Sequence, residues 1–240
     1  YYFNQTSNYD LKEVYNSKNV IFSRNDFNKN MNYRIHLEPK FRELKKKKIK
    51  LKQVYIDYVT DYFEKNNLKN KKILGVHFRG TSYKTSRGHI FPATKDQMKQ
   101  NVDKIFSKEK FDKIFLCSEE KNYLDFFIKN YSDKLLYLNT YRSDQNDAFK
   151  KYNRKNHRYL LGDESIKEAL ILSNCSSLLF VRSNIINAAN FFSNKEQNLY
   201  EIFNGFNSRN QFISRFLWFI KKNLPTNFYG LKDELLKSKN

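Results

Sequence analysis

The sequence is poor in cysteine, proline and glycine, and it has no long uncharged apolar run. Its 240 residues include two cysteines, Cys117 and Cys175, and neither has another Cys or a His at metal-ligand spacing. A disulfide framework is therefore excluded, and a reducing cytoplasm is the expected compartment. The longest uncharged apolar stretch, between Glu168 and Arg182, is far shorter than the ~20 residues that cross a bilayer. No basic-then-apolar leader is present, so we expect no secretory signal.

The few glycines and histidines exclude several well-known sites. With six glycines, the chain has neither a G-x-x-x-x-G-K phosphate loop nor a G-x-G-x-x-G dinucleotide fingerprint. Its four histidines show no H-x-x-x-H or H-E-x-x-H spacing, which argues against a zinc site. An Asp-x-Asp pair that would hold a divalent ion against a diphosphate is also missing. We therefore expect no bound metal and no cofactor.

Positive charge dominates the composition. Lys and Arg number 45 against 25 Asp and Glu, which gives a net charge of +20. Lysine greatly outnumbers arginine, and Asn, Phe, Tyr and Ile are abundant, as the codon bias of an AT-rich genome would produce. The charge is thus weak evidence for an anionic partner. A basic single-stranded nucleic-acid-binding protein is kept as an alternative, although most aromatic residues fall on the apolar stripes of expected helices and strands.

The segment before residue 72 has the pattern of a long helix. From Pro39, placed as an N1 proline, apolar residues recur at three- and four-residue spacing as far as Phe63, and a strand is predicted at 19–23. The lysine-rich run Lys45–Lys52 is most simply the solvated face of this helix. The alternative is a peripheral contact with a membrane surface or another polyanion. Residues 1–71 form the first predicted domain.

From residue 72 short apolar runs alternate with helical segments. This alternation predicts an α/β fold, a Rossmann-like doubly wound parallel sheet with helices on both faces. The second predicted domain spans residues 72–240, and an amphipathic helix at 211–222, ended by Pro225, packs back on it. The predicted strands are 72–78, 113–117, 135–138 and 177–181, and the predicted helices are 94–106, 119–130, 164–174 and 184–192.

Polar segments follow three of the predicted strands. In an open α/β sheet, ligands bind beyond the carboxyl ends of the strands, where loops and helix N-termini converge. The segments carry two arginines, several hydroxyls, a glycine for close backbone approach, and expected helix N-termini at Ser118 and Ser183. Guanidinium forks and free N–H groups match the oxygens and charge of a pyrophosphate. We predict a nucleotide diphosphate site, with ordinary N-caps as the alternative for the two serines. The segments are 77–83, 118–120 and 182–184.

Three motifs in order resemble those of a known family. The segment His77-Phe78-Arg79-Gly80-Thr81-Ser82 is similar to the H-x-R-[RG]-T-D signature of fucosyltransferases, the group that joins bacterial nodulation and animal α1,6-fucosyltransferases to the protein O-fucosyltransferases. Residues 114–120 resemble the family's strand that ends in a T/S-D/E-D/E step. Residues 168–184 resemble its closing motif of acidic helix, strand and Ser-rich turn. The resemblance covers roughly residues 72–195.

The resemblance implies a GT-B glycosyltransferase, inverting and metal-independent, that transfers fucose or a related sugar from a GDP-sugar to a bacterial surface glycan such as capsule or lipopolysaccharide. Residues 72–240 would bind the nucleotide sugar, and residues 1–71 would be an incomplete or reduced acceptor half of a cytoplasmic enzyme at the inner membrane. Arg79 would hold the β-phosphate, His77 would touch the guanosine, Ser183 would contact the phosphates and Glu168 would lie near base and ribose. The other donor-binding candidates are Gly80, Thr81, Ser118, Glu119, Arg182 and Asn184.

The chain departs from the family pattern in ways that leave the catalytic base unassigned. Ser82 replaces an Asp that would orient Arg79, and Arg87 stands where the α1,6 enzymes have a proposed base. His89, on the same loop, has a suitable ordinary pKa of ~6.5 and is our catalytic candidate beside Arg79, with a surface role as the simpler alternative. The carboxylates of residues 119 and 120 are further candidates. These departures keep open a transferase that moves another group from another nucleotide donor.

Overall fold

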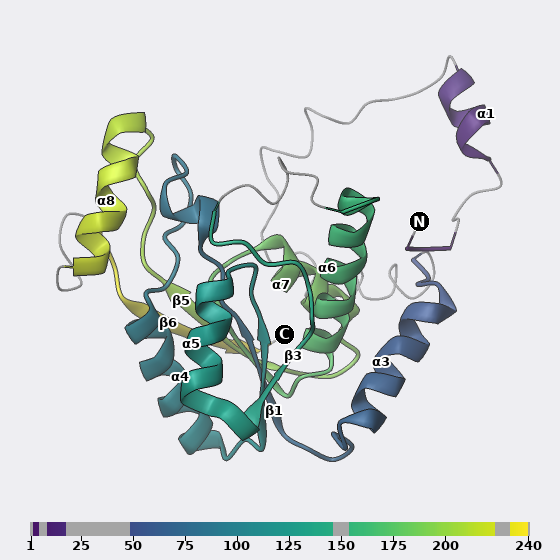
Figure 1. Ribbon diagram of the computed structural model, residues 1–240, viewed down its shortest axis with the longest axis horizontal. Helices are drawn as coiled ribbons and strands as arrows, with labels where there is room; N and C mark the ends of the chain where they lie inside the picture. Colours follow the sequence, from purple (N-terminus) through teal and green to yellow (C-terminus); the bar gives the residue numbers. More distant parts are fainter. Residues whose placement is uncertain (1, 5–8, 18–48, 146–153, 224–230, 240) are drawn as a thin grey trace. The chain divides into compact units, whose positions relative to one another are not determined.

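The computed structural model describes residues 2–4, 9–17, 49–145, 154–223 and 231–239 (Figure 1). The chain forms two compact units, Tyr1–Tyr62 and Phe63–Asn240. Several predictions from sequence concern residues outside the described ranges, so they stay predictions. These are the strand at 19–23, the helix start at Pro39, residues 45–48 of the lysine run and the helix end at Pro225.

The first unit contains helix α1 (Leu11–Asn16) and most of helix α3 (Gln53–Lys65). One long helix running through residues 49–52 is a wrong prediction. Leu51 instead forms an antiparallel bridge with Phe3, and the neighbouring backbone groups pair with residues 2–4. Since these N–H and C=O groups bond to another segment, they are not available to a helix, and α3 begins only at Gln53.

The second unit is built on a six-stranded sheet with the strand order β3-β2-β1-β4-β5-β6. The first five strands in sequence are mutually parallel, and β6 runs antiparallel to β5 at the edge. This order confirms the doubly wound α/β fold that the alternating pattern predicts. The strands are β1 (Ile73–His77), β2 (Lys113–Cys117), β3 (Leu135–Tyr137), β4 (Ser177–Phe180), β5 (Asn198–Phe203) and β6 (Glu234–Lys239).

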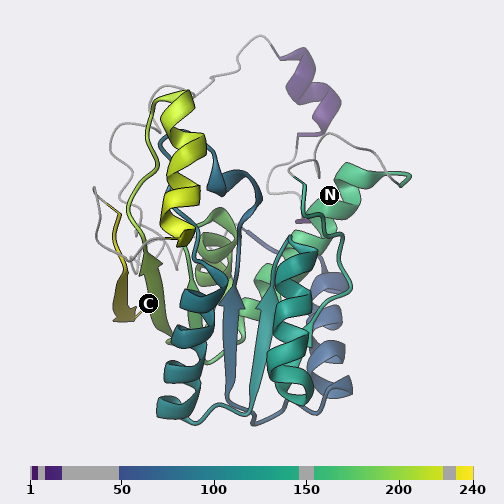
Figure 2. The ribbon, with the colours of Figure 1, turned by 60° about the vertical axis from the view of Figure 1, so that its left-hand side comes forward.

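Helices cover both faces of this sheet. Figures 1 and 2 show α4 and α5 against one face and α6 and α7 against the other. From β1 the chain first adds strands on one side of the sheet and then on the other. Because the crossover connections have the same handedness in both directions, the helices of the two halves lie on opposite faces. The helices are α4 (Lys95–Glu109), α5 (Lys121–Tyr131), α6 (His157–Ser173), α7 (Asn184–Phe192) and α8 (Gln211–Asn223), with 3₁₀ turns η2 (Thr81–Lys84) and η3 (Ser132–Lys134).

Strand β1 lies at the centre of the sheet, and all five of its residues are buried. Its glycine, Gly75, faces α6 and β4, where an added Cβ would lie 2.7 Å from a methyl of Leu178 and 2.8 Å from a methyl of Leu172. Just past the strand, the Phe78 ring stacks on Tyr123 of α5 at 3.7 Å between centroids. The segment that follows β1 therefore begins at a tightly packed position in the protein.

Sequence patterns miss β5, β6 and the first two turns of α6. In β5 the buried Glu201 interrupts the apolar run, and it is tolerated because Arg182 pairs with it. Strand β6 is charged and mostly exposed, so its pattern reveals no buried face. The segment forms a strand because its backbone pairs with β5, which lies more than 30 residues earlier in the sequence. Helix α6 begins at His157 rather than 164.

Candidate active site

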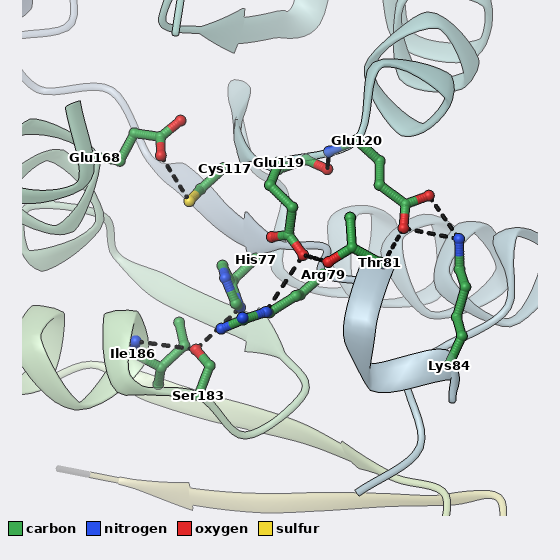
Figure 3. Close-up of polar contacts among 11 residues, drawn as sticks. His77, Arg79, Thr81, Lys84, Cys117, Glu119, Glu120, Glu168, Ser183 and Ile186 are labelled. Atoms are coloured by element: carbon green, nitrogen blue, oxygen red, sulfur yellow. Dashed lines mark hydrogen bonds and ion pairs between the residues drawn. The ribbon is translucent and has the colours of Figure 1, made fainter. Parts of the chain in front are cut away.

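The strand order reverses its direction of winding between β1 and β4, and the residues that follow these strands meet there. Ser183, after β4, places its Oγ 3.3 Å from Nδ1 of His77 at the end of β1. The segment after β2 lies on the other side of β1, so Glu119 contacts Arg79 and Thr81 (Figure 3). Open α/β sheets bind ligands at such a reversal. The three polar segments predicted from sequence therefore share one edge of the sheet.

A cavity of about 760 Å³ opens at this edge. That volume lies in the usual range for small-molecule sites. The lining includes five predicted donor-binding residues, Arg79, Thr81, Ser118, Glu119 and Glu168. It also includes residues that sequence reasoning missed. These come from the segment after β3 and from the first half of α6, and they include Thr140, Tyr141, Arg158, Glu164 and Ser165.

Arg79 is held at the cavity by two neighbours. Its guanidinium lies over the Tyr83 ring, 4.2 Å from the centroid, and its Nε is 3.3 Å from Oε1 of Glu119. This contact is an ion pair, since Nε makes no hydrogen bond in the described part of the chain. The Arg79 side chain keeps 26% of its surface exposed. The guanidinium is thus fixed over the aromatic ring and retains donors for an anionic ligand.

Glu119 joins the segments after β1 and β2. The same Oε1 that faces Arg79 accepts a hydrogen bond of 2.8 Å from Thr81 Oγ1. Burial raises the pKa of the Glu119 carboxyl, while Arg79 and Thr81 oppose the rise. Glu119 therefore supplies a carboxylate beside Arg79.

Glu120 anchors the turn that carries Thr81. Its side chain is 2% exposed, Lys84 Nζ lies 2.7 Å from both carboxylate oxygens, and the Thr81 N–H also donates to it. At Gly80 an added Cβ would collide with the Glu120 carboxylate and lie 2.6 Å from Tyr123 Oη, so a larger residue would displace these side chains. Gly80 thus allows a close approach of protein side chains and does not line the cavity.

His77 is fully buried beside the N-terminus of α7 and does not line the cavity. Burial, followed by the nearby charge of Arg79, lowers its pKa from 6.5 to about 3, so the ring is neutral. Its Nε2 has no hydrogen-bond partner in the described residues. On the other side of the ring, Ser183 caps α7 by accepting the Ile186 N–H at 3.4 Å, as predicted for a helix N-terminus.

Glu168 of α6 lies at the cavity wall next to the end of β2. Its carboxylate accepts from Thr140 Oγ1 at 3.3 Å and from Cys117 Sγ at 3.4 Å, and Arg142 Nη2 is 3.9 Å away. Burial raises its pKa to about 7, and the Arg142 charge opposes the rise. This carboxyl can therefore change its protonation near neutral pH.

Other predicted site residues lie outside the cavity lining. Arg182 turns toward β5, where its Nε and Nη2 are each 2.7 Å from Oε1 of Glu201. His89 is exposed and contacts the Tyr83 ring at 5.1 Å between centroids. Asn184 is exposed in the first turn of α7.

Ser118 lines the cavity but does not begin a helix, so that expectation is wrong. Helix α5 starts at Lys121 with Glu120 at the N-cap, and Ser118 Oγ instead accepts the Glu120 N–H at 3.2 Å. The serine thus shapes the turn between β2 and α5. A serine directly after a strand has the same place in the sequence whether it caps the next helix or bonds within the turn, so its position alone could not separate these two roles.

Across 49–145, 154–223 and the shorter described ranges, no three His, Cys, Asp or Glu side chains gather in a metal-binding arrangement. In the same part of the chain, none of the helices combines the length and apolarity of a membrane span.

No protein-family model matches this sequence, and no curated protein matches it. Among solved structures, the chain is similar to NodZ alpha-1,6-fucosyltransferase co-crystallized with GDP, with 14% identity, a TM-score of 0.46, and coverage of 69% of this chain and 49% of that chain. POFUT1 in complex with GDP has 10% identity and a TM-score of 0.40, with coverage of 65% and 47%. A mutant of Arabidopsis thaliana FUT1 in complex with GDP has 13% identity and a TM-score of 0.39, with coverage of 66% and 35%. The chain spans about half the length of the first two and less of the third.

Proposed function

We propose that residues 72–240 are the nucleotide-sugar-binding half of an inverting, metal-independent glycosyltransferase that resembles the fucosyltransferases. It would transfer fucose or a related sugar from a GDP-sugar to a surface glycan. The observation that carries the proposal is the position of Arg79, which lines the cavity directly after the central strand β1 and within the H-x-R segment. The expected acceptor half, the cytoplasmic location and a membrane contact through Lys45–Lys52 belong to the same proposal.

Arg79 has the properties of a phosphate clamp. Its guanidinium is partly exposed at the cavity and is oriented by the Tyr83 ring and Glu119. When the bond between sugar and β-phosphate breaks, negative charge grows on the departing diphosphate. A guanidinium placed there stabilises the transition state more than the bound donor, which accelerates the chemical step.

The other cavity residues suit the rest of a nucleotide. Thr81 and Ser118 offer hydroxyls near Arg79, and Glu168 offers a carboxyl that can accept N–H groups of a base or hydroxyls of a ribose. The proposal keeps His89 as the candidate base. Because His89 is exposed beside Tyr83, that role requires the acceptor to bind against this loop.

A nucleotide panel tests the donor. We expect GDP and GDP-fucose to raise the unfolding midpoint of the chain more than UDP, CDP or ADP do. At a hundredfold excess over its dissociation constant, a ligand adds about 2.7 kcal/mol of stability. A stronger effect of another nucleotide would favour the second candidate, transfer of a different group from a different donor, for which Ser82 and Arg87 are the motivating departures. Binding of single-stranded DNA with a steep salt dependence, without any nucleotide response, would contradict both.

A variant pair tests the clamp. Arg79→Ala should weaken GDP binding at least tenfold by calorimetry and abolish GDP release from GDP-fucose in the presence of acceptor. Arg215→Ala is the matched control, since Arg215 is an exposed arginine on α8 and does not line the cavity. Equal GDP affinity in Arg79→Ala and the unmodified chain would overturn the assignment.

A further inference from the structure

Helix α8 is oriented with polar residues toward the protein and aromatic residues toward solvent. Ser214 and Lys221, seven residues apart, are 1% and 3% exposed. Lys221 Nζ donates to the Lys232 carbonyl at 2.9 Å, and the Ser214 carbonyl accepts from Asn207 Nδ2 at 3.1 Å. The predicted helix is confirmed, and it packs back on the domain through these buried polar contacts.

The outward side of α8 is an aromatic face formed by Phe212, Phe216 and Phe219. These side chains are 82%, 60% and 62% exposed, and they follow at spacings of four and three residues, so they lie on one side of the helix. Phe216 and Phe219 contact each other with 6.1 Å between ring centroids. Figures 1 and 2 show α8 standing apart from the helices that cover the sheet. Exposing three adjacent rings is costly in water, which marks the face as a contact surface.

Positively charged side chains are exposed on α8 and just before it in sequence. Residues 204–223 contain no Asp or Glu, while Arg209, Arg215 and Lys222 are exposed. Aromatic rings on one side of a helix with cations at its margins are the pattern of helices that lie in the plane of an anionic lipid surface. The rings enter the acyl boundary, and the cations remain with the phosphate headgroups.

We propose that α8 binds this chain to membranes containing anionic phospholipid, with Phe212, Phe216 and Phe219 inserted at the interface. A second copy of the chain fits the same face less well. Two copies would bring like charges together, and a 13-residue helix about 20 Å long and about 10 Å wide covers far less than the ~800 Å² per partner of a stable interface. This proposal does not depend on the glycosyltransferase assignment.

The single tryptophan of the chain provides a direct probe. Trp218 lies on α8, next to Phe219 in sequence, and is half-buried. Vesicles of phosphatidylcholine with phosphatidylglycerol should shift its emission to the blue, and brominated acyl chains should quench it. Pure phosphatidylcholine vesicles should have a much smaller effect, and added salt should weaken the binding, because part of the attraction is electrostatic.

Substitutions on α8 test whether its three exposed phenylalanines make the contact with the membrane. The triple variant Phe212→Ser, Phe216→Ser and Phe219→Ser should lower the vesicle partition coefficient at least tenfold in co-sedimentation, with an unchanged circular dichroism spectrum. The matched control removes three exposed aliphatic side chains elsewhere and should bind normally. Unchanged binding of the aromatic triple variant, or no binding by the unmodified chain, would overturn the proposal. A dimer that the aromatic triple variant converts to monomer, without lipid binding, would also overturn it and assign the face to a second copy. The control substitutions are Val54→Ser, Ile56→Ser and Ile128→Ser.

Discussion

Glu119 Oε1 lies 3.3 Å from Arg79 Nε, so a carboxylate from the end of β2 faces the guanidinium from the end of β1. These two residues are 40 positions apart in sequence and meet because β1 and β2 are adjacent parallel strands in register. The carboxylate beside Arg79 is therefore contributed by the end of a neighbouring strand. The pair connects the fold directly to the proposed chemistry.

Removing the charge of Glu119 should separate binding from turnover. In Glu119→Gln, Arg79 loses a fixed partner, while the diphosphate loses a repulsive neighbour, so we expect the GDP dissociation constant to change by less than about threefold. Turnover should fall about tenfold, since alignment matters most in the transition state. Calorimetry and donor kinetics measure the two quantities. Glu196→Gln, at an exposed surface ion pair, is the control. A parallel loss of affinity and turnover would show that Glu119 acts on donor binding itself.

His77 should make the protein sensitive to acid. Its pKa falls from 6.5 to about 3 on folding, whereas the unfolded chain takes up a proton below pH 6.5. The stability linked to the neutral ring is complete above pH 6.5 and is lost as the pH falls toward 3. From pH 6.5 to 4.5 the unmodified chain should lose about 2 kcal/mol relative to His77→Gln. Urea unfolding at several pH values measures this, and equal pH slopes for both proteins would argue against a neutral buried ring.

Glu168 should make the folded protein less stable as the pH rises, opposite to the effect of His77. Burial raises its pKa from 4.5 to about 7, so the folded chain holds a proton that the unfolded chain has released. The stability that this bound proton adds to the folded state is fully present below pH 4.5 and is lost as the pH rises through 7. Between these values the unmodified chain should lose about 3 kcal/mol relative to Glu168→Gln, which keeps the size of the side chain. The measurement is again urea unfolding, with Glu196→Gln as an exposed control. A steeper loss in Glu168→Gln would refute the raised pKa.

Lys84 and Glu120 should form a strongly coupled pair. Lys84→Met leaves a carboxylate that is 2% exposed without its cation, and breaking such a pair typically costs about 3–5 kcal/mol. Adding Glu120→Gln removes the stranded charge, so the double variant should be more stable than Lys84→Met alone. Chemical denaturation of all four proteins gives the coupling energy. Additive effects would mean that the two side chains do not interact.

Local patterns were sufficient for most of the sheet. Strands β1, β2 and β4 are nearly continuous buried runs, and their helices have apolar stripes, so both types of element appear in the sequence without knowledge of neighbours. The polar segments after these strands then follow from the rule that parallel strands end at one edge. Strand β6 could not be found in this way, because its charged residues form a strand only by pairing with β5.

The sequence alone determined the doubly wound fold, the motif around Arg79 and the edge where the polar segments gather, because these depend on periodicity and chain order. The tertiary structure decided which of the candidates share the cavity. It turned Arg182 toward Glu201, brought Glu119 to Arg79, and set α8 with its aromatic side outward. These contacts depend on residues from distant strands and helices. A local sequence pattern does not determine which distant residue a side chain will contact.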